Sequence, residues 1–236
     1  MKQLILGLFL CSTMGLYAQN DQKSGTFDSR YLEDQFYLGI TYNFFRGKPV
    51  GFTQRNLSYG LHGGVIKDMP VNSRRTLAIG IGLGYAVNSY YSNLWAFKTL
   101  DGIGYSLIND DRIPMGEETV KVERNKLETH VIELPFELRW RNSTPEVYRF
   151  TRIYAGMKFG YIFASRSKLV TSMDKSSFTN PDVLRFQYGI TLNIGYNTFN
   201  AHVYYSLSGL FEDGPVLGAE SIDLKPIRVG FVFYIL

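Results

Sequence analysis

Residues 77–87 read LAIGIGLGYAV, and glycine alternates there with bulky apolar residues. An alternation of period two predicts a β-strand, because successive side chains of a strand point to opposite faces. The glycines of this stretch share one face: Gly80, Gly82 and Gly84. Glycine weakens a strand interior, since it costs chain entropy and gives neighbouring side chains nothing to pack against. Three glycines on one face therefore predict that this face lines a very narrow space.

The same alternation recurs in eight segments of the chain, and bacterial outer-membrane barrels have an even number of strands. In each segment one face is apolar or aromatic, and the other carries glycine, polar or charged residues. The segments cover residues 36–44, 57–67, 77–87, 129–140, 153–163, 186–196, 201–208 and 227–235. The sequence therefore predicts an all-β protein with eight antiparallel strands.

The volume inside a barrel of this size decides which face points outward. An eight-stranded barrel has an interior just wide enough for its own side chains, so the large apolar residues of all strands cannot fit there. We therefore expect an eight-stranded antiparallel up-and-down transmembrane β-barrel whose apolar face contacts lipid. The residues expected to face lipid include Leu77, Ile79, Ile81, Leu83, Phe159, Phe231 and Phe233. A β-sandwich is the alternative, but its polar face lies in water and has no need of glycine.

The connections between these segments alternate in length. The long ones are polar or irregular and cover residues 45–56, 88–127, 165–183 and 209–224. The short ones are 67–74, 141–149 and 197–200. Outer-membrane barrels have short periplasmic turns and long external loops, so we expect the long connections outside the cell. Aromatic residues at both strand ends predict two interfacial girdles, with Tyr42, Phe44 and Tyr85 near the outside and Trp140, Tyr196 and Tyr234 near the periplasm.

The start of the chain has the features of an export signal. Residues 1–18 contain one basic residue, a short apolar run and a small residue at Ala18. Cleavage there would remove Cys11, the only cysteine, which excludes disulfides and thiolate chemistry from the mature chain. Leu10 precedes this cysteine and does not favour a lipoprotein signal. We expect a signal peptide over 1–18, a polar periplasmic tail over 19–34 and an outer-membrane barrel over 35–236.

Several charged residues fall on the face assigned to the lumen, where charges are expected to pair with one another. This expected network consists of Glu133, Glu137, Arg139, Arg152, Lys158, Arg185 and Arg228. Glu133 and Glu137 lie four residues apart on one strand, which places them about 13 Å apart. That separation is too large for a mechanism with paired carboxylates. We expect the two glutamates to pair with Lys158, Arg152 or Arg139 instead.

The sequence shows little sign of a metal site, a catalytic nucleophile or a nucleic-acid-binding surface. His62 and His202 share the lumen face, but no third ligand is evident for a metal between them. The acidic residues of the second long loop do not have the spacing of a calcium loop: Asp101, Asp110, Asp111, Glu117 and Glu118. No G-x-S-x-G motif occurs, and the net charge of +4 is not gathered into a basic block that would suit nucleic acid. We expect a non-enzymatic protein without cofactor or metal.

Five segments carry a family resemblance: EDQFYLGITYNF, SYGLHGGVIKDMPVNSRR, HVIELPFELRWRNSTPE, RIYAGMKFGYIFA and FQYGITLNIGYNTFN. Over residues 35–236 the chain resembles the PorT-like outer-membrane β-barrel proteins of Bacteroidota. The resemblance implies a cleaved signal peptide, an outer-membrane location and an accessory part in type IX protein secretion. The final segment, GFVFYIL, departs from the usual assembly signal of outer-membrane proteins because it ends in Leu236 and not in an aromatic residue.

The expected partners are outer-membrane lipid and lipopolysaccharide, the barrel-insertion machinery and proteins of a secretion complex. A small porin-like channel, or a structural barrel with surface-binding loops, is the alternative function. Eight strands argue against a channel, because open aqueous channels usually have about sixteen strands or more.

Overall fold

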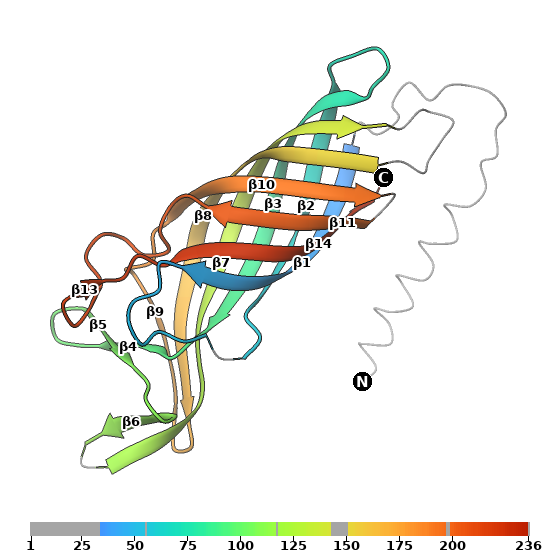
Figure 1. The fold of residues 1–236 in the computed structure, drawn as a ribbon. Helices are drawn as coiled ribbons and strands as arrows, with labels where there is room; N and C mark the ends of the chain where they lie inside the picture. Colours follow the sequence, from blue (N-terminus) through green and yellow to red (C-terminus); the bar gives the residue numbers. More distant parts are fainter. Residues whose placement is uncertain (1–33, 55, 117, 143–150, 197–198, 236) are drawn as a thin grey trace, which may run out of the picture. The chain divides into compact units, whose positions relative to one another are not determined.

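Eight long strands pair side by side and close into an antiparallel barrel in the computed structural model (Figure 1). The structure describes residues 34–54, 56–116, 118–142, 151–196 and 199–235. The barrel strands are β1 (Asp34–Arg46), β2 (Tyr59–Pro70), β3 (Leu77–Tyr91), β7 (Glu118–Arg141), β8 (Thr151–Thr171), β10 (Phe186–Tyr196), β11 (Phe199–Ser206) and β14 (Lys225–Ile235). Pairing of β1 with β14 and of β7 with β8 completes the circle. The predicted eight-stranded fold is confirmed.

The two ends of the barrel differ. At one end, which we call the turn end, β1 begins and β14 ends, and residues 71–76 connect β2 to β3. A short hydrogen-bonded turn forms there, in which Asn72 Oδ1 accepts from the amide of Leu77. We call the opposite end the loop end, because the longer connections gather there (Figure 1).

Six short strands lie at the loop end, where the sequence analysis expected irregular loops. They are β4 (Leu94–Lys98), β5 (Ile103–Leu107), β6 (Arg112–Met115), β9 (Lys175–Thr179), β12 (Val216–Leu217) and β13 (Glu220–Ser221). The expectation was wrong for 88–127 and 165–183, because β7 and β8 keep pairing as far as Val122 and Thr171. That ladder supplies hydrogen bonds for β6 on one edge and β9 on the other.

Nearly all of the expected signal peptide and polar tail lies outside the described residues, which begin at Asp34. The described residues belong to one compact unit. Among them, no helix has the length and apolar character that a membrane crossing by a helix needs.

The outer wall of the barrel is apolar. Leu77, Ile81, Leu83 and Phe231 are about half exposed to the surroundings, with fractions of 48%, 47%, 54% and 51%. Ile79, Phe159 and Phe233 lie on the same wall and are partly covered by their neighbours. Large apolar side chains left exposed over a whole wall indicate contact with lipid.

One aromatic residue expected in the periplasmic girdle lies inside the barrel. Tyr234 is 7% exposed and its ring contacts Tyr154, with the ring centroids 5.5 Å apart. The girdle assignment was wrong because Tyr234 alternates with Phe233 and Ile235, which point outward.

The glycines of β3 face the lumen at points where large side chains from other strands approach. A β-carbon at Gly80 would lie 2.6 Å from Nε of Arg139, and one at Gly84 would overlap the hydroxyl of Tyr37. A β-carbon at Gly82 would lie 2.5 Å from the carbonyl oxygen of Val65. These separations are shorter than van der Waals contact, so a larger residue could enter only if its neighbours moved.

The orientation of the apolar wall can be tested with one substitution on each face. Leu83→Arg places a charge on the lipid side near the middle of β3, and we expect it to lower the free energy of unfolding by about 2–4 kcal/mol. Thr191→Ser, at a buried lumen position, is the control and should change it little. Urea titration of the protein refolded into lipid vesicles measures both. Equal stability of the two variants would show that the faces are assigned the wrong way round.

Candidate functional site

The lumen contains buried charged side chains from several strands. Glu133, Glu137 and Arg139 come from β7, and Lys158 and Arg228 come from β8 and β14. All five are at most 5% exposed. They point inward because each occupies the strand position that alternates with an apolar, outward residue.

One ion-pair cluster, which we call the central cluster, crosses the middle of the lumen. Glu133 Oε2 accepts from Lys158 Nζ at 2.9 Å, and Glu133 Oε1 accepts from Arg228 Nη1 at 3.1 Å. The Arg228 guanidinium also lies over the ring of Tyr204, 4.4 Å from its centroid. In the order of strands around the barrel, β14 is four positions from β7 in either direction. The pair of Glu133 with Arg228 therefore joins opposite walls.

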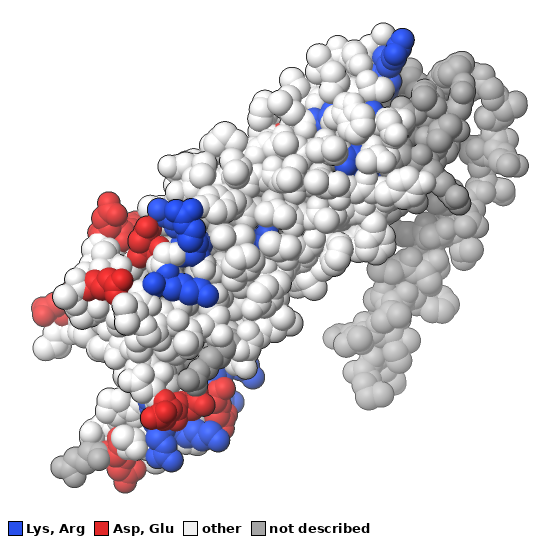
Figure 2. All heavy atoms as spheres, viewed as in Figure 1, with Lys and Arg blue, Asp and Glu red and all other residues white. Residues whose placement is uncertain are grey.

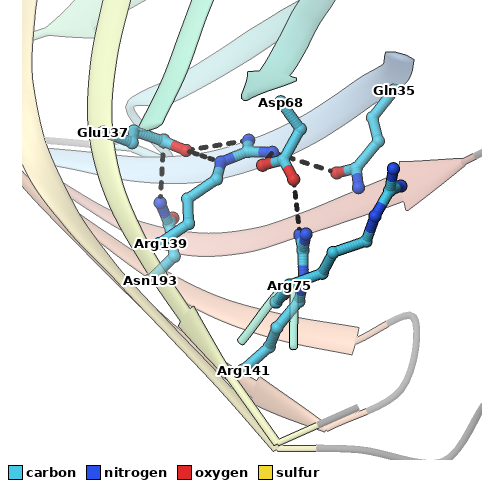
Figure 3. A network of polar contacts seen from close by, with 7 residues as sticks. All are labelled: Gln35, Asp68, Arg75, Glu137, Arg139, Arg141 and Asn193. Atoms are coloured by element: carbon cyan, nitrogen blue, oxygen red, sulfur yellow. Dashed lines mark hydrogen bonds and ion pairs between the residues drawn. The ribbon is translucent and has the colours of Figure 1, made fainter. Parts of the chain in front are cut away.

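A second cluster, which we call the turn-end cluster, lies nearer the turn end (Figure 3). Arg139 Nε donates to Glu137 Oε2 at 2.9 Å, and Arg139 Nη1 donates to Asp68 Oδ1 at 3.0 Å and Gln35 Oε1 at 3.2 Å. Arg141 Nη1 lies 2.6 Å from Asp68 Oδ2. The side chains of Asp68, Arg139 and Arg141 are fully buried. Charges buried so completely are stable only when they are paired and hydrogen-bonded in this way.

The turn-end cluster contains residues that the sequence analysis missed. Asp68 was assigned to a turn over 67–74, whereas β2 continues to Pro70, and Arg141 was assigned to the following turn. Both continue the lumen-facing alternation of their strands, so that alternation could have found them. Asn193 of β10 adds a hydrogen bond to Glu137 Oε1 at 3.2 Å.

The two remaining arginines of the expected network lie in different places. Arg152 is buried, and its guanidinium lies 5.9 Å from the ring centroid of Tyr154 and 5.8 Å from that of Tyr234. Both distances are within the range of cation–π attraction. Arg185 is exposed and does not belong to the buried network. Its assignment to the lumen was wrong, because β10 begins only at Phe186 and the alternation does not extend to the preceding residue.

The two lumen histidines lie side by side. The rings of His62 and His202 are 5.1 Å apart between centroids, and His202 Nδ1 is 2.5 Å from Asn193 Oδ1. Among the residues that the structure describes, no group of three or more His, Cys, Asp or Glu side chains is arranged to hold a metal. A cavity of about 10 Å³ adjoins the histidines, Tyr37 and Lys158. This is room for about one water molecule.

Apolar side chains close the loop end of the lumen. A buried cluster joins barrel residues to residues from the connections: Phe45, Phe52, Ala86, Tyr90, Leu94, Val131, Ile162, Val183, Leu210, Phe211, Ile222 and Leu224. Burial of this apolar surface stabilises the connections against the barrel mouth. Within the described residues, paired charges thus fill the middle of the lumen and the part near the turn end, and an apolar core fills the loop end.

Beyond the barrel, the extended sheet of β6, β7, β8 and β9 carries a cleft of about 330 Å³. Trp95 and Phe97 of β4 line it together with Phe178 of β9, and the two β4 rings are 4.7 Å apart. Nearby, Tyr105 of β5 donates to Asp182 Oδ2 at 2.9 Å. Burial raises the pKa of Tyr105, so its hydroxyl stays protonated and continues to donate.

Among the described residues, the acidic side chains of the second long loop do not belong to a group of three or more that could hold a metal ion. Asp101, Asp110, Asp111 and Glu118 are exposed, and Glu117 lies outside the described residues.

The sequence model of the family described as outer membrane protein beta-barrel domain matches residues 17–212. The chain belongs to this family. A search among curated proteins finds no match. Two solved structures of outer-membrane proteins show low similarity to this outer-membrane barrel. Ail, the attachment invasion locus protein of Yersinia pestis, is 10% identical, with 86% of this chain and 97% of that chain covered and a TM-score of 0.36. A triple mutant of the Rhodopseudomonas blastica porin is 8% identical, with 86% and 99% covered and a TM-score of 0.19.

The central cluster can be tested through its shared carboxylate. Glu133→Gln leaves Lys158 and Arg228 buried without a counter-charge, and we expect it to lower the free energy of unfolding by about 3–5 kcal/mol. Glu118→Gln removes the same charge at an exposed position of β7 and should have little effect. Adding Lys158→Met to Glu133→Gln should recover part of the loss. Urea titration in vesicles measures all three, and a Glu133→Gln protein as stable as the control would contradict the pairing.

Proposed function

We propose that this outer-membrane barrel is a closed, non-enzymatic scaffold that does not conduct solutes. The observation that carries the proposal is the pair of Glu133 with Arg228, which joins opposite walls of the lumen. A water-filled path would have to pass this pair, and opening it would leave the buried Arg228 guanidinium without its carboxylate partner, while Glu133 would keep its pair with Lys158. Breaking a buried pair of this kind typically costs about 3–5 kcal/mol.

Two further features support a closed lumen. The turn-end cluster ties β1, β2, β7 and β10 together below the central cluster. Apolar side chains fill the mouth at the loop end, where Phe45 and Tyr90 pack with their ring centroids 4.8 Å apart. An eight-stranded barrel has little interior space beyond that needed for its own side chains. The alternative of a small porin-like channel is less well supported for these reasons.

The scaffold's working surface, on this proposal, is the extended sheet at the loop end. β7 has 24 residues. Such a strand is roughly 80 Å long, well over the length that crosses a membrane. The sheet ends in β6 on one side and β9 on the other. Edge strands present unpaired backbone groups with which another chain can pair. We infer that the loop end faces the cell exterior and that partner proteins bind there.

The finer proposal is an accessory part in type IX protein secretion, which the resemblance to PorT-like proteins implies. On this proposal the barrel is inserted by the barrel-insertion machinery after export and removal of residues 1–18. It then anchors the extended sheet beside the other components of the secretion complex. A scaffold needs no catalytic group and no cofactor for such a role.

Conductance separates the scaffold from the channel. Purified protein reconstituted into a planar lipid bilayer should give no steps above the noise, because the paired charges and the apolar mouth block the lumen. A porin reconstituted in parallel controls for successful insertion. Stable ohmic steps that scale with the amount of inserted barrel would overturn the closed-lumen proposal.

The secretion role is tested by affinity capture of tagged protein from detergent-solubilised outer membranes. We expect secretion components to be recovered with the intact chain and lost from a Ser177→Pro variant, because the amide of Ser177 points to the free edge of β9 and proline removes this donor. Thr191→Ser, inside the barrel, is the matched control and should capture the same proteins as the intact chain. Deletion of the gene should also reduce the secreted proteins. Capture without secretion components and an unchanged set of secreted proteins would refute the role.

A further inference from the structure

A row of basic residues follows the loop-end rim of the apolar outer wall. In the upper part of the loop end in Figure 2, Lys and Arg lie between the uncharged wall and the Asp and Glu residues, whereas charges of both signs are intermixed on the lower arm. The rim residues are Arg46, Lys126, Arg166, Lys168, Arg185 and Lys225. They lie on or beside β1, β7, β8, β10 and β14, so the row extends over several strands.

The arrangement on β1 and β14 is the most informative part of the row. Arg46 and Lys225 are direct partners in the ladder that closes the barrel. Each occupies the outward position that follows five apolar outward residues of its strand, ending at Phe44 on β1 and Ile227 on β14. Like charges placed directly opposite on one face of a sheet destabilise it. Two opposed cations at this rim therefore need an anion near them.

The protein supplies only part of that negative charge. Lys225 Nζ lies 3.1 Å from Asp223 Oδ2, but the side chain of Asp223 is 62% exposed. An ion pair so open to water contributes little. Arg46 donates to the hydroxyl of Tyr205 and lies over its ring, and among the described residues it forms no ion pair with a carboxylate. The guanidinium thus keeps donors free for an external anion.

A second pair of directly opposed cations on the same rim is neutralised by a carboxylate of the protein itself. Lys126 and Lys168 are direct partners on β7 and β8, and Glu128 accepts from both, at 2.6 Å and 2.7 Å. The carboxylate of Glu128 thus lies between the two ammonium groups and neutralises them. No described carboxylate bridges Arg46 and Lys225 in this way.

The position of Arg46 and Lys225 identifies the kind of anion that can reach them. The stacked rings of Tyr42 and Phe44, 6.3 Å apart, lie next to it on the outer wall. Aromatic residues of this kind mark the boundary between hydrocarbon and headgroups. A lipid whose acyl chains cover the adjoining apolar wall would place its headgroup at this position. The anion within reach is therefore a lipid headgroup. Guanidinium and ammonium groups together bind phosphate through charge-assisted hydrogen bonds.

We propose that Arg46 and Lys225 bind the phosphate of a phosphorylated lipid whose acyl chains pack on the outer wall of β1 and β14. The lipid phosphate takes the place that Glu128 takes between Lys126 and Lys168. This inference depends on the barrel lying in the membrane and not on the closed lumen, so a conducting barrel would leave it intact.

The test uses the full-length protein in neutral detergent with bisphosphorylated lipid A as the probe. Native mass spectrometry measures the fraction of protein that retains the lipid. We expect the double variant Arg46→Gln with Lys225→Gln to bind at least about tenfold more weakly, because it loses both charge-assisted contacts. The control removes the same charge away from the rim, with Lys121→Gln on β7 and Lys175→Gln on β9, and should bind as the unchanged protein does.

Further arms distinguish the sources of phosphate and the effect of folding. Lipid A stripped of both phosphates should bind the unchanged protein as weakly as the intact lipid binds the rim variant. Inorganic phosphate at equal concentration should not displace the lipid, and full displacement would overturn the lipid assignment. Equal retention of lipid A by the two double variants would also overturn the proposal. If the rim variant does not fold, Lys225→Gln alone replaces it, with an expected loss of about threefold.

Discussion

The narrow space inside an eight-stranded barrel is the constraint on which the other features of this protein depend. Because the space is small, bulky apolar residues must point outward, and they make a wall that only lipid can cover. For the same reason glycine occupies inward positions of β3, where side chains such as Arg139 and Tyr37 approach from other strands. Arg139 fills the space beside Gly80, and Tyr37 fills the space beside Gly84.

Filling the lumen with charges has an energetic consequence that differs from that of an apolar core. Removing a charge from water is costly, and the mutual attraction of a pair offsets the cost only when hydrogen bonds complete the geometry. Arg139 meets this condition through contacts with Glu137, Asp68 and Gln35. Asp68 and Gln35 lie on β2 and β1, so their contacts with Arg139 of β7 also favour one arrangement of strands over shifted registers. The lumen therefore serves as the core of the protein.

When the lumen is a core, function has to lie at the ends and on the outer surface. Two regions stand out there for different physical reasons. The extended sheet has free edges at β6 and β9, which suit pairing with another chain. The rim has opposed cations at Arg46 and Lys225, which suit a phosphate. Both lie at the loop end, and on our proposals they act on different partners, one a protein beyond the membrane and the other a lipid within it.

The sequence by itself determined the class of fold, the eight strands and the direction of the apolar wall, because alternation of period two and the small barrel volume are local and general constraints. It also indicated that Glu133, Glu137, Arg139, Arg152, Lys158 and Arg228 share one face, since each follows the alternation of its strand. The prediction failed for Arg185, which lies just before β10 begins, and for Tyr234, whose side chain points into the lumen and not toward the membrane interface. Only the tertiary structure decided that Glu133 reaches Arg228 and Arg139 reaches Asp68. The strand registers and the closure of β1 on β14 determine which inward residues meet, and neither can be read from the alternation of any single strand.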